Sequence, residues 1–397
     1  MPASENVSVA ASIYPSDLYG YATLLAAEEQ AALLRLRSVL ETSVRPVIDD
    51  HWERGEFPFE IVQPLAELDL MPPNSPAQQG SALFSGFTIF EMARMDASVA
   101  TFYTAQAGLF RTAVNVGGSQ EQVDRLDPLI RSFEATGVFC LTEPEHGSDI
   151  AGGLATSARR DGDDWVLNGE KRWIGAASSA KYLAIFARDE ADHEVKAFLV
   201  ASDAPGVTLN KIRRKTSLRM VQNADIRLQN VRVSEADRLQ RVNSFRDVAD
   251  MLRRMRSDVA WLATGVQAGA YEAAVRYVTQ RQQFGKPLAA FQLIQERLAL
   301  MLGNLTSSLG MVVRLSQQQH EGHYVDENSA LAKMYCSLRM RETVALAREV
   351  VGGNGIVLEN DVARFHADAE AVYTYEGTHD INALIVGRAI TGVGAFR

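Results

Sequence analysis

The segment from residue 373 to 388, which reads YTYEGTHDINALIVGR, places one carboxylate, Glu376, between an aromatic residue and a glycine. A base that removes a weakly acidic C–H proton needs a raised pKa, which burial beside apolar groups supplies. It also needs a nearby backbone N–H that stabilises negative charge on a carbonyl oxygen. Tyr375 and Gly377 suit these two tasks, so the pattern indicates that Glu376 is a candidate proton-abstracting base. An ordinary solvated turn can have the same local sequence, so the rest of the chain must decide.

Four other segments combine polar, glycine and aromatic residues at spacings that are informative together. They read CLTEPEHGSD at 140–149, GEKRWIG at 169–175, QRQQFGKP at 280–287 and VGGNG at 351–355. With the 373–388 segment, these motifs resemble the acyl-CoA dehydrogenase family, especially its branch of glutaryl-CoA dehydrogenases and plant short-chain acyl-CoA oxidases. The resemblance extends over roughly residues 25 to 397. Any one motif would be weak evidence, whereas all of them in register are specific.

Hydrophobic spacing predicts the elements that must position these residues. Short β-prone runs occur at 165–167, 182–186, 197–200, 207–209 and 226–233, and Asn168-Gly169 predicts a hairpin turn. Helical stripes lie before and after them: Leu33, Leu36, Leu40, Val44 and Val47; Leu262, Val266, Ala270, Ala273 and Tyr277; Leu298, Met301, Leu302, Leu305 and Leu309. The first 20 or so residues are polar and irregular, and predict an arm rather than a core element.

The resemblance implies the same order of helix, β and helix. We expect an α+β protein with an N-terminal arm and helical domain over residues 1–136 and a small β-barrel or β-sandwich domain over residues 137–245. A C-terminal four-helix bundle is expected over residues 246–397.

The composition is that of a soluble globular protein of 397 residues, 47% hydrophobic and 22% charged. Forty Lys and Arg against 49 Asp and Glu give a net charge of −9, which argues against broad attraction to nucleic acid or an anionic membrane. Cys140 and Cys336 are too few for a disulfide framework or a Cys-rich metal site. We see no signal-peptide pattern, no Arg-rich transit segment and no apolar run that predicts a membrane span. These features predict a cytoplasmic protein.

The resemblance implies that FAD binds between the β domain and the C-terminal bundle. Structural alternatives remain open for several of the matching residues: a cap or turn for Thr142 and Ser148, a β-domain core position for Trp173, a surface ion pair for Arg281 and a helix C-cap for the glycines. His379 has no partner histidines at ligand spacing, so we expect no metal site. The matched FAD contacts are Phe139, Leu141, Thr142, Ser148, Trp173, Ile174, Gly175, Arg281, Gln283, Phe284, Gln292, Glu349, Gly352, Gly353, Thr378, His379 and Asp380.

Arg281, Gln283 and Phe284 resemble the family motif that reaches the FAD pyrophosphate of a neighbouring subunit. A planar guanidinium suits phosphate because it forms paired, charge-assisted hydrogen bonds. The resemblance therefore implies at least a homodimer, and commonly a homotetramer.

For the substrate, the resemblance implies an acyl-CoA thioester that contacts Ser148, Gly377, Arg256 and Arg388, although each arginine could equally be a surface residue. Glu376 would remove the α-proton while a hydride leaves the β-carbon for FAD, which gives a trans-2-enoyl-CoA. Glutaryl-CoA dehydrogenases carry an arginine for the distal carboxylate at the position of Ala100. Because a buried carboxylate without a cation is costly, we expect a short or medium monoacyl chain.

Gly175 leaves the electron acceptor open. Most dehydrogenases of the family have a threonine there, whereas the plant oxidase branch resembles this chain at Gly175 and along residues 218–223. A dehydrogenase that passes electrons to electron-transfer flavoprotein is the first interpretation, and an oxidase that passes them to O₂ is the second. A glutaryl-CoA dehydrogenase-like enzyme with an altered substrate and an FAD-carrying binding protein are further alternatives. The presence of Glu376 argues against the last, and Met255 leaves no second base at the position that some relatives use.

Overall fold

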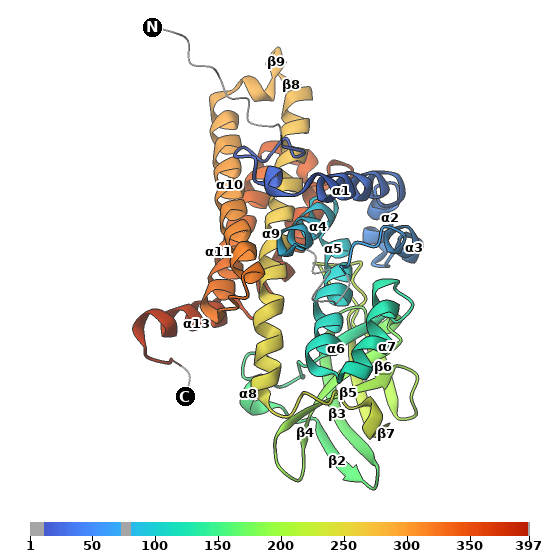
Figure 1. Ribbon diagram of the computed structural model, residues 1–397. Coiled ribbons are helices and arrows are strands. Elements are labelled where there is room, and N and C mark those ends of the chain that lie inside the picture. The colour runs from blue at the N-terminus through green and yellow to red at the C-terminus, as the bar shows by residue number, and fades with distance from the viewer. Residues whose placement is uncertain (1–11, 73–80, 396–397) are drawn as a thin grey trace.

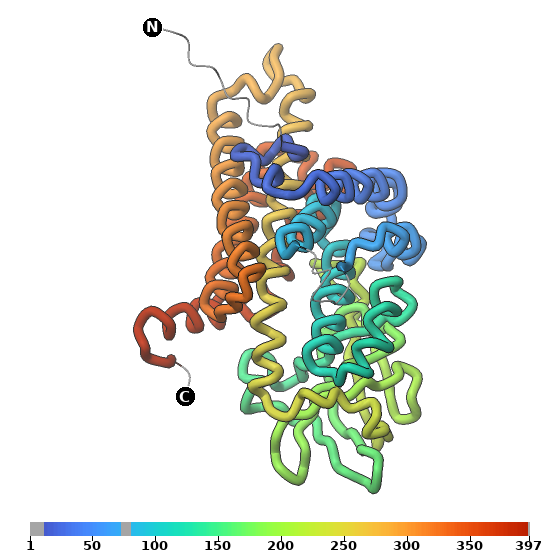
Figure 2. Tube along the Cα trace, viewed as in Figure 1, coloured from blue at the N-terminus to red at the C-terminus, as the bar shows by residue number. Residues whose placement is uncertain are grey.

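The computed structural model describes residues 12–72 and 81–395. Three long helices run side by side along the molecule, shorter N-terminal helices lie along one side of them, and a β-sheet lies at one end (Figure 1). The last helix projects away from the long helices (Figure 2). The predicted α+β order of helix, β and helix is confirmed.

The N-terminal region is helical because its helices begin at polar caps and bury apolar faces. Ser81 accepts a hydrogen bond from the Phe84 N–H, and Asp96 accepts from the N–H groups of Ser98 and Val99. The helix α4 packs against the long helix α9. The elements are η1 (Tyr21–Leu24), α1 (Ala27–Val39), η2 (Leu40–Val44), α2 (Ile48–Arg54), η3 (Phe59–Ile61), α3 (Val62–Ala66), α4 (Ala82–Met95), α5 (Ala97–Thr104), η4 (Ala105–Phe110), α6 (Arg111–Gly117) and α7 (Gln120–Arg131).

Residues 12–20 are not the arm that the sequence predicted. Tyr14 is only 1% exposed, and its ring centroid lies 5.7 Å from that of Phe87 and 4.9 Å from that of Phe90. The Asp17 carboxylate accepts hydrogen bonds from the backbone N–H groups of Tyr21 and Ala22. The prediction is wrong here because one aromatic anchor in a polar segment produces no periodic signal. Residues 1–11 lie outside the described part of the chain.

The middle of the chain forms one curled seven-stranded sheet, and all five predicted β-prone runs lie in its strands. The strand order is β1-β4-β2-β3-β7-β6, with β5 beside β4. The elements are β1 (Gly137–Cys140), α8 (Ile150–Gly153), β2 (Ser157–Asp161), β3 (Asp164–Ile174), η5 (Ala177–Ser179), β4 (Tyr182–Asp189), β5 (Val195–Ala201), β6 (Val207–Lys211), β7 (Ala224–Ser234) and η6 (Glu235–Asp237).

Asn168 and Gly169 lie inside β3 rather than in the predicted hairpin turn. The pairing with β7 shifts register between Leu167 and Gly169, and the Asn168 side chain accepts a hydrogen bond of 2.8 Å from the Asn230 N–H. Gly169 has φ of 148°, and a Cβ there would lie 2.5 Å from the Thr156 hydroxyl oxygen. The Asn-Gly pair therefore forms a bulge, because a bulge and a tight hairpin turn both favour glycine.

The C-terminal region is built on long helices whose predicted apolar stripes face one another. Val266, Ala270, Met301, Leu305 and Leu309 are all fully buried. The elements are α9 (Phe245–Gln280), β8 (Gln282–Gln283), β9 (Lys286–Pro287), η7 (Leu288–Ala290), α10 (Gln292–His320), α11 (Asp326–Val351), η8 (Gly352–Ile356), η9 (Leu358–Asn360), α12 (Val362–Thr374) and α13 (His379–Thr391). Both cysteines, Cys140 and Cys336, are free and buried.

The helix α10 corrects one expectation from the sequence. Within residues 12–72 and 81–395 it is the one helix that is long and apolar enough, by length and composition, to cross a membrane. The prediction that no apolar run could do so is therefore wrong by that criterion. The same stripe, with Met301, Leu305 and Val312 fully buried, packs against α9 and α11. A core helix of a soluble protein meets the same criterion, so the finding is weak evidence for a span.

Candidate active site

Glu376 lies in the tight connection between α12 and α13. Glu376 and Gly377 both have left-handed backbone conformations, with φ of 54° and 85°. Lys333 of α11 holds this connection, since its ammonium donates hydrogen bonds to the carbonyl oxygens of Tyr373 (2.7 Å) and Gly377 (2.8 Å). Asn382 donates to the same Gly377 oxygen at 2.9 Å. The backbone is therefore fixed on both sides of the carboxylate.

Burial and the neighbouring charges have opposite effects on the pKa of Glu376. Burial raises the pKa of Glu376, while the positive charges of Arg256 and Lys333 oppose that rise. Burial lowers the pKa of Lys333 to about 8, and Glu376 acts in the opposite direction. On α9, burial and then Glu376 raise the pKa of Asp258 to about 7. A half-buried carboxylate with a raised pKa is the environment expected of a proton-abstracting base.

The helix α5 lies beside the base. The Tyr375 hydroxyl lies 3.4 Å from the Thr101 hydroxyl, and burial raises the Tyr375 pKa. Ala100, the position where the resemblance places the carboxylate-binding arginine of glutaryl-CoA dehydrogenases, is fully buried on the same helix. Arg94 precedes this helix, but its guanidinium donates to Glu91 at 2.7 Å and Glu272 at 2.6 Å. Those two glutamates already occupy the Arg94 cation.

The strands β1 and β3 bring several predicted cofactor residues to one edge of the β domain. The Arg172 N–H donates to the Thr142 carbonyl at 2.9 Å, so the residues after β1 run beside the end of β3. Trp173 is 53% exposed with φ of 65°, which excludes the core-residue alternative for its side chain. Ile174 is buried next to it, and a Cβ on Gly175 would lie 3.5 Å from Val221.

A buried ion pair between Lys171 and Glu143 stabilises this edge of the β domain. The Lys171 ammonium donates to Glu143 at 2.8 Å and to the Leu141 carbonyl at 3.1 Å. Glu143 also accepts from the N–H groups of Ala155 and Thr156. Burial lowers the pKa of Lys171 to about 8, and Lys171 lowers the pKa of Glu143 despite its burial. All polar groups of the pair are therefore occupied by protein.

Phe139 and Ser148 flank the same edge. The Phe139 ring is half-buried and lies 4.4 Å from that of Phe186. Ser148 is exposed just before α8, whose N-cap is Asp149 without a side-chain cap hydrogen bond. The helix-cap alternative for Ser148 is therefore wrong.

Arg281, Gln283 and Phe284 lie at the opposite end of the long helix α9 from the β-sheet (Figure 1). The helix has 36 residues, so its ends are about 54 Å apart. Arg281 is exposed, Phe284 is 91% exposed, and Gln292 is exposed at the start of α10. The surface-ion-pair alternative for Arg281 finds no ion-pair partner within residues 12–72 and 81–395. A single chain does not bring this group to Glu376.

The remaining predicted residues divide into two groups. Glu349 pairs with Arg297 at 2.7 Å, and Gly352 is the C-cap of α11 with φ of 66°, as the structural alternative proposed. The space that a Cβ would occupy on Gly353 is open.

The others surround Glu376 at the start of α13. Thr378 caps that helix by accepting from the Ile381 N–H, and Asp380 is exposed in its first turn. The His379 ring stacks on Tyr373, and its buried Nδ1 has no hydrogen-bond partner in the described residues.

The two matched arginines differ in their environment. Arg256 is half-buried, donates to Asp326 at 3.1 Å and acts on Glu376. Arg388 is exposed on α13. Among the described residues, no group of three His, Cys, Asp or Glu side chains could hold a metal ion.

The chain belongs to the acyl-CoA dehydrogenase family, a family of FAD-dependent oxidoreductases that dehydrogenate acyl-CoA. It matches the family's N-terminal domain over residues 26–134, its middle domain over 138–231 and its C-terminal domain over 245–391. It is 32% identical to a 3-(aryl)acrylate reductase of Clostridium sporogenes, over 90% of this chain and 97% of that protein. A caffeyl-CoA reductase-Etf complex subunit, CarC of Acetobacterium woodii, is 29% identical over 86% of this chain and 92% of that protein.

A solved structure is similar over nearly the full length. It is a glutaryl-CoA dehydrogenase from Mycobacterium smegmatis in complex with FADH2, with a TM-score of 0.91 and 30% identity. The alignment covers 97% of this chain and all of that chain. The predicted family, fold class and FAD cofactor are thereby confirmed.

The residues present fit FAD. Trp173 offers a large exposed ring, and His379 offers a buried ring nitrogen without a hydrogen-bond partner among residues 12–72 and 81–395. Thr142 and the open surface of Gly353 supply small polar and backbone contacts. A flavin needs an apolar cover, hydrogen bonds to its ring edge and cations for its pyrophosphate. Arg281, which the family resemblance predicts as the cation for the pyrophosphate, lies at the far end of α9 and does not join these residues within one chain.

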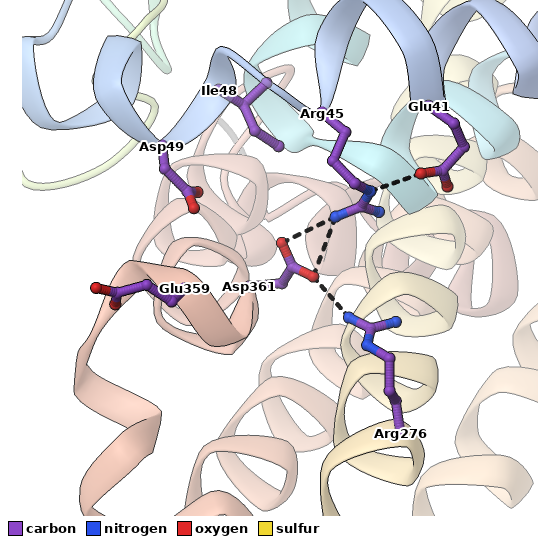
Figure 3. A pocket seen from close by; sticks show the side chains of 7 residues that line it. All are labelled: Glu41, Arg45, Ile48, Asp49, Arg276, Glu359 and Asp361. Atoms are coloured by element: carbon purple, nitrogen blue, oxygen red, sulfur yellow. Dashed lines mark hydrogen bonds and ion pairs between the residues drawn. The ribbon is translucent and has the colours of Figure 1, made fainter.

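A polar hollow of about 440 Å³ lies elsewhere, between α2, α9 and η9 (Figure 3). Asp361 accepts from Arg276 at 2.7 Å and from Arg45 at 3.3 Å, and Arg45 also pairs with Glu41 at 2.7 Å. Its two arginines are thus occupied by protein carboxylates. The hollow contains none of the predicted site residues.

The sequence analysis did not identify two charged residues beside the base, Lys333 and Asp258. Lys333 lies among buried positions of α11 such as Ala330, Ala332 and Cys336, and Asp258 is followed directly by the buried apolar run of residues 259–262 on α9. A charge on a buried helix face is a usable signal, because such a group needs a specific partner. The partner itself is not visible in the sequence.

Proposed function

We propose that this enzyme dehydrogenates a short- or medium-chain acyl-CoA to a trans-2-enoyl-CoA and passes the electrons to electron-transfer flavoprotein. The observation that carries the proposal is the Glu376 carboxylate, whose pKa burial raises, in a backbone turn fixed by Lys333 and Asn382.

The chain's own residues account for proton abstraction. Glu376 removes the proton on the α-carbon, and its carboxylate becomes a carboxylic acid. No protein acceptor in the described part of the chain binds the backbone N–H of Glu376, so it is free to donate to the thioester carbonyl. That bond stabilises the negative charge that develops on the oxygen. When bound, FAD supplies the acceptor for the hydride from the β-carbon, and the C=C bond forms between the two carbons.

The charges around the acyl region favour a substrate other than glutaryl-CoA. Ala100 offers no cation, Arg94 is bound to Glu91 and Glu272, and Asp258 adds a negative charge near the base. A carboxylate at the far end of the acyl chain would therefore lie near the acidic residue Asp258 and would find no free cation from Ala100 or Arg94.

Electron-transfer flavoprotein is preferred as acceptor because a relative of similar length, CarC, is named as a subunit of a reductase-Etf complex. An oxidase that uses O₂ is the second candidate, and Gly175 is the observation that favours it. Gly175 has no left-handed φ, and a Cβ would make only ordinary contacts of 3.5 Å with Val221 and 3.7 Å with Asn223. The backbone thus does not require glycine there. A Gly175→Thr variant that leaves the ratio of O₂ to artificial-acceptor rates unchanged would contradict the oxidase role of Gly175.

The exposed Arg281 and Phe284 support a homo-oligomer in which each chain completes a neighbour's cofactor site. A dimer of dimers accommodates this arrangement. We propose a cytoplasmic location, which the two free and buried cysteines support.

Anaerobic titration of the holoenzyme with a panel of straight-chain acyl-CoAs, followed by flavin absorbance, tests the proposal. We expect bleaching with short or medium chains and slow recovery when air is admitted. Absence of bleaching with every thioester would refute dehydrogenation. Immediate recovery in air would instead assign the oxidase.

A further inference from the structure

One acidic residue beside Glu376 has no part in the proton abstraction. Asp258 lies on α9, two residues after Arg256, and is half-buried. Within residues 12–72 and 81–395 it has neither a hydrogen-bond nor an ion-pair partner. Burial of a carboxylate without a partner costs free energy, and no protein group in the described part of the chain offsets that cost.

The backbone opposite Asp258 is shaped to leave room for it. One carboxylate oxygen of Asp258 lies 2.4 Å from the point where a Cβ on Gly108 would be, so any larger residue at 108 would collide with it. Gly108 belongs to η4, and the charge of Asp258 also acts on Tyr103 of α5. Asp258 therefore lies where α9 faces the α5–η4 wall, with Glu376 within electrostatic reach.

The positions of the two α9 charges indicate which end of a substrate meets Asp258. Residues two apart on a helix do not face the same direction, so Arg256 and Asp258 diverge. Arg256 contacts Asp326 of α11 and acts on Glu376, which gives that side a cation. An anionic CoA moiety suits the cationic side. The acyl end then extends past Glu376 toward Asp258, Tyr103 and Gly108.

We propose that Asp258 is a specificity-determining residue that accepts a hydrogen bond from a donor on the acyl chain beyond the β-carbon. The substrate class is a short acyl-CoA that carries a hydroxyl or ammonium group. This inference rests on the proposed function and narrows its substrate. A site built to bond a polar substrate group rejects the analogue that lacks it, because its own polar group is then left unpaired.

The test compares three thioesters of similar size with the holoenzyme: pentanoyl-CoA, 4-hydroxybutyryl-CoA and 4-aminobutyryl-CoA. We expect the native enzyme to prefer at least one polar substrate over pentanoyl-CoA by tenfold or more in kcat/KM. Asp258→Ala should lower that ratio at least tenfold and raise the rate with pentanoyl-CoA. Asp258→Asn, which keeps an acceptor oxygen without the charge, should retain part of a hydroxyl preference and lose an ammonium preference.

Ser257→Ala is the matched control, because Ser257 is buried on the neighbouring position of α9 and bonds only the Arg254 carbonyl. It should leave the ratio unchanged. A ratio is independent of the amount of folded enzyme, so partial unfolding of a variant does not affect it. A native preference for pentanoyl-CoA that persists in Asp258→Ala would overturn the inference. In that case flavin bleaching by pentanoyl-CoA would still support dehydrogenation, whereas no bleaching with any of the three would remove both.

Discussion

Two buried lysines show how differently this protein uses the same charge. Lys171 in the β domain has a carboxylate partner, Glu143, whose oxygens also accept two backbone N–H groups. Within the described residues, Lys333 in the C-terminal bundle donates to carbonyl oxygens, and it acts on the Glu376 carboxylate electrostatically without a hydrogen bond. Burial lowers the pKa of both ammonium groups to about 8. The first lysine completes a closed network, and the second leaves a carboxylate available for a ligand.

The difference separates a structural role from a chemical one. A fully bonded ion pair fixes the strand ends that carry Leu141 and Thr142, and offers nothing to a substrate. The Glu376 carboxylate interacts electrostatically with nearby cations but forms no hydrogen bond with them, so it stays available for reaction. Its pKa is set by the balance between burial and these charges. The polar hollow of Figure 3 resembles the closed network, because both of its arginines are paired with protein carboxylates.

The largest effect is expected at the unpaired carboxylate. Glu376→Gln keeps the size of the side chain but removes the base, so the rate of flavin bleaching by acyl-CoA should fall roughly 10³-fold or more. Anaerobic stopped-flow absorbance measures that rate. Binding of acyl-CoA to the variant, seen as a shift of the flavin spectrum, is the control for folding. Bleaching at the native rate would exclude Glu376 as the base.

The closed network should respond in stability. Lys171→Met leaves Glu143 buried without its cation, and we expect a loss of about 3–5 kcal/mol in the free energy of unfolding. Urea unfolding followed by circular dichroism measures it. The double variant Lys171→Met/Glu143→Leu removes both charges and should recover part of the loss. A single variant as stable as the native protein would show that the pair contributes no rigidity.

Asp258 predicts a pH-dependent stability. Its folded pKa of about 7 lies above the unfolded value of about 3.9, so its contribution to stability is present at low pH and is lost as pH rises through 7. Asp258→Asn cannot ionise. The variant should therefore gain on the native protein by about 3–4 kcal/mol between pH 4 and pH 8. Thermal unfolding at matched pH measures the gap, with exposed Asp124→Asn as a control that shows no such growth.

The smallest effect is expected from Lys333. Its positive charge favours ionised Glu376, so Lys333→Gln should raise the Glu376 pKa and move the acid limb of the kcat/KM profile to higher pH. On the acid limb we expect roughly tenfold lower activity at a given pH. Above about pH 8 the native Lys333 loses its own charge, so the two profiles should converge.

The control for Lys333 is Cys336→Ser, one turn further along α11 and fully buried. It tests whether any disturbance of this helix moves the profile. An unshifted acid limb in Lys333→Gln would limit Lys333 to holding the backbone of the turn.

The sequence predicts the architecture and a candidate base, Glu376, because both depend on local pattern. Helical stripes such as Leu298 to Leu309 and the alternation within β7 survive in the fold, since burial follows periodicity. Glu376 was found because its neighbours form a motif. Charges across separate elements leave no such signal: Lys333 meets Glu376 and Asp258 meets Gly108 only after α9, α11 and η4 pack together.

Two errors of the sequence analysis have the same origin, because residues distant in the chain decide both conformations. The Asn168-Gly169 pair indicates that the backbone can adopt a positive φ there. It does not indicate whether that conformation forms a bulge or a hairpin turn. Tyr14 is an isolated anchor, and its partners Phe87 and Phe90 lie more than 70 residues away in the chain.

The left-handed conformation of Glu376 limits where this enzyme can vary. A non-glycine residue in that conformation is strained by about 1–3 kcal/mol, and the grip of Lys333 and Asn382 on Gly377 keeps it there. The direction in which the Glu376 carboxylate points is thus set by the main chain as well as by the side-chain rotamer. A substitution in the wall formed by α5 and η4 would then change the space for the acyl group while the backbone of the Glu376 turn stays as it is.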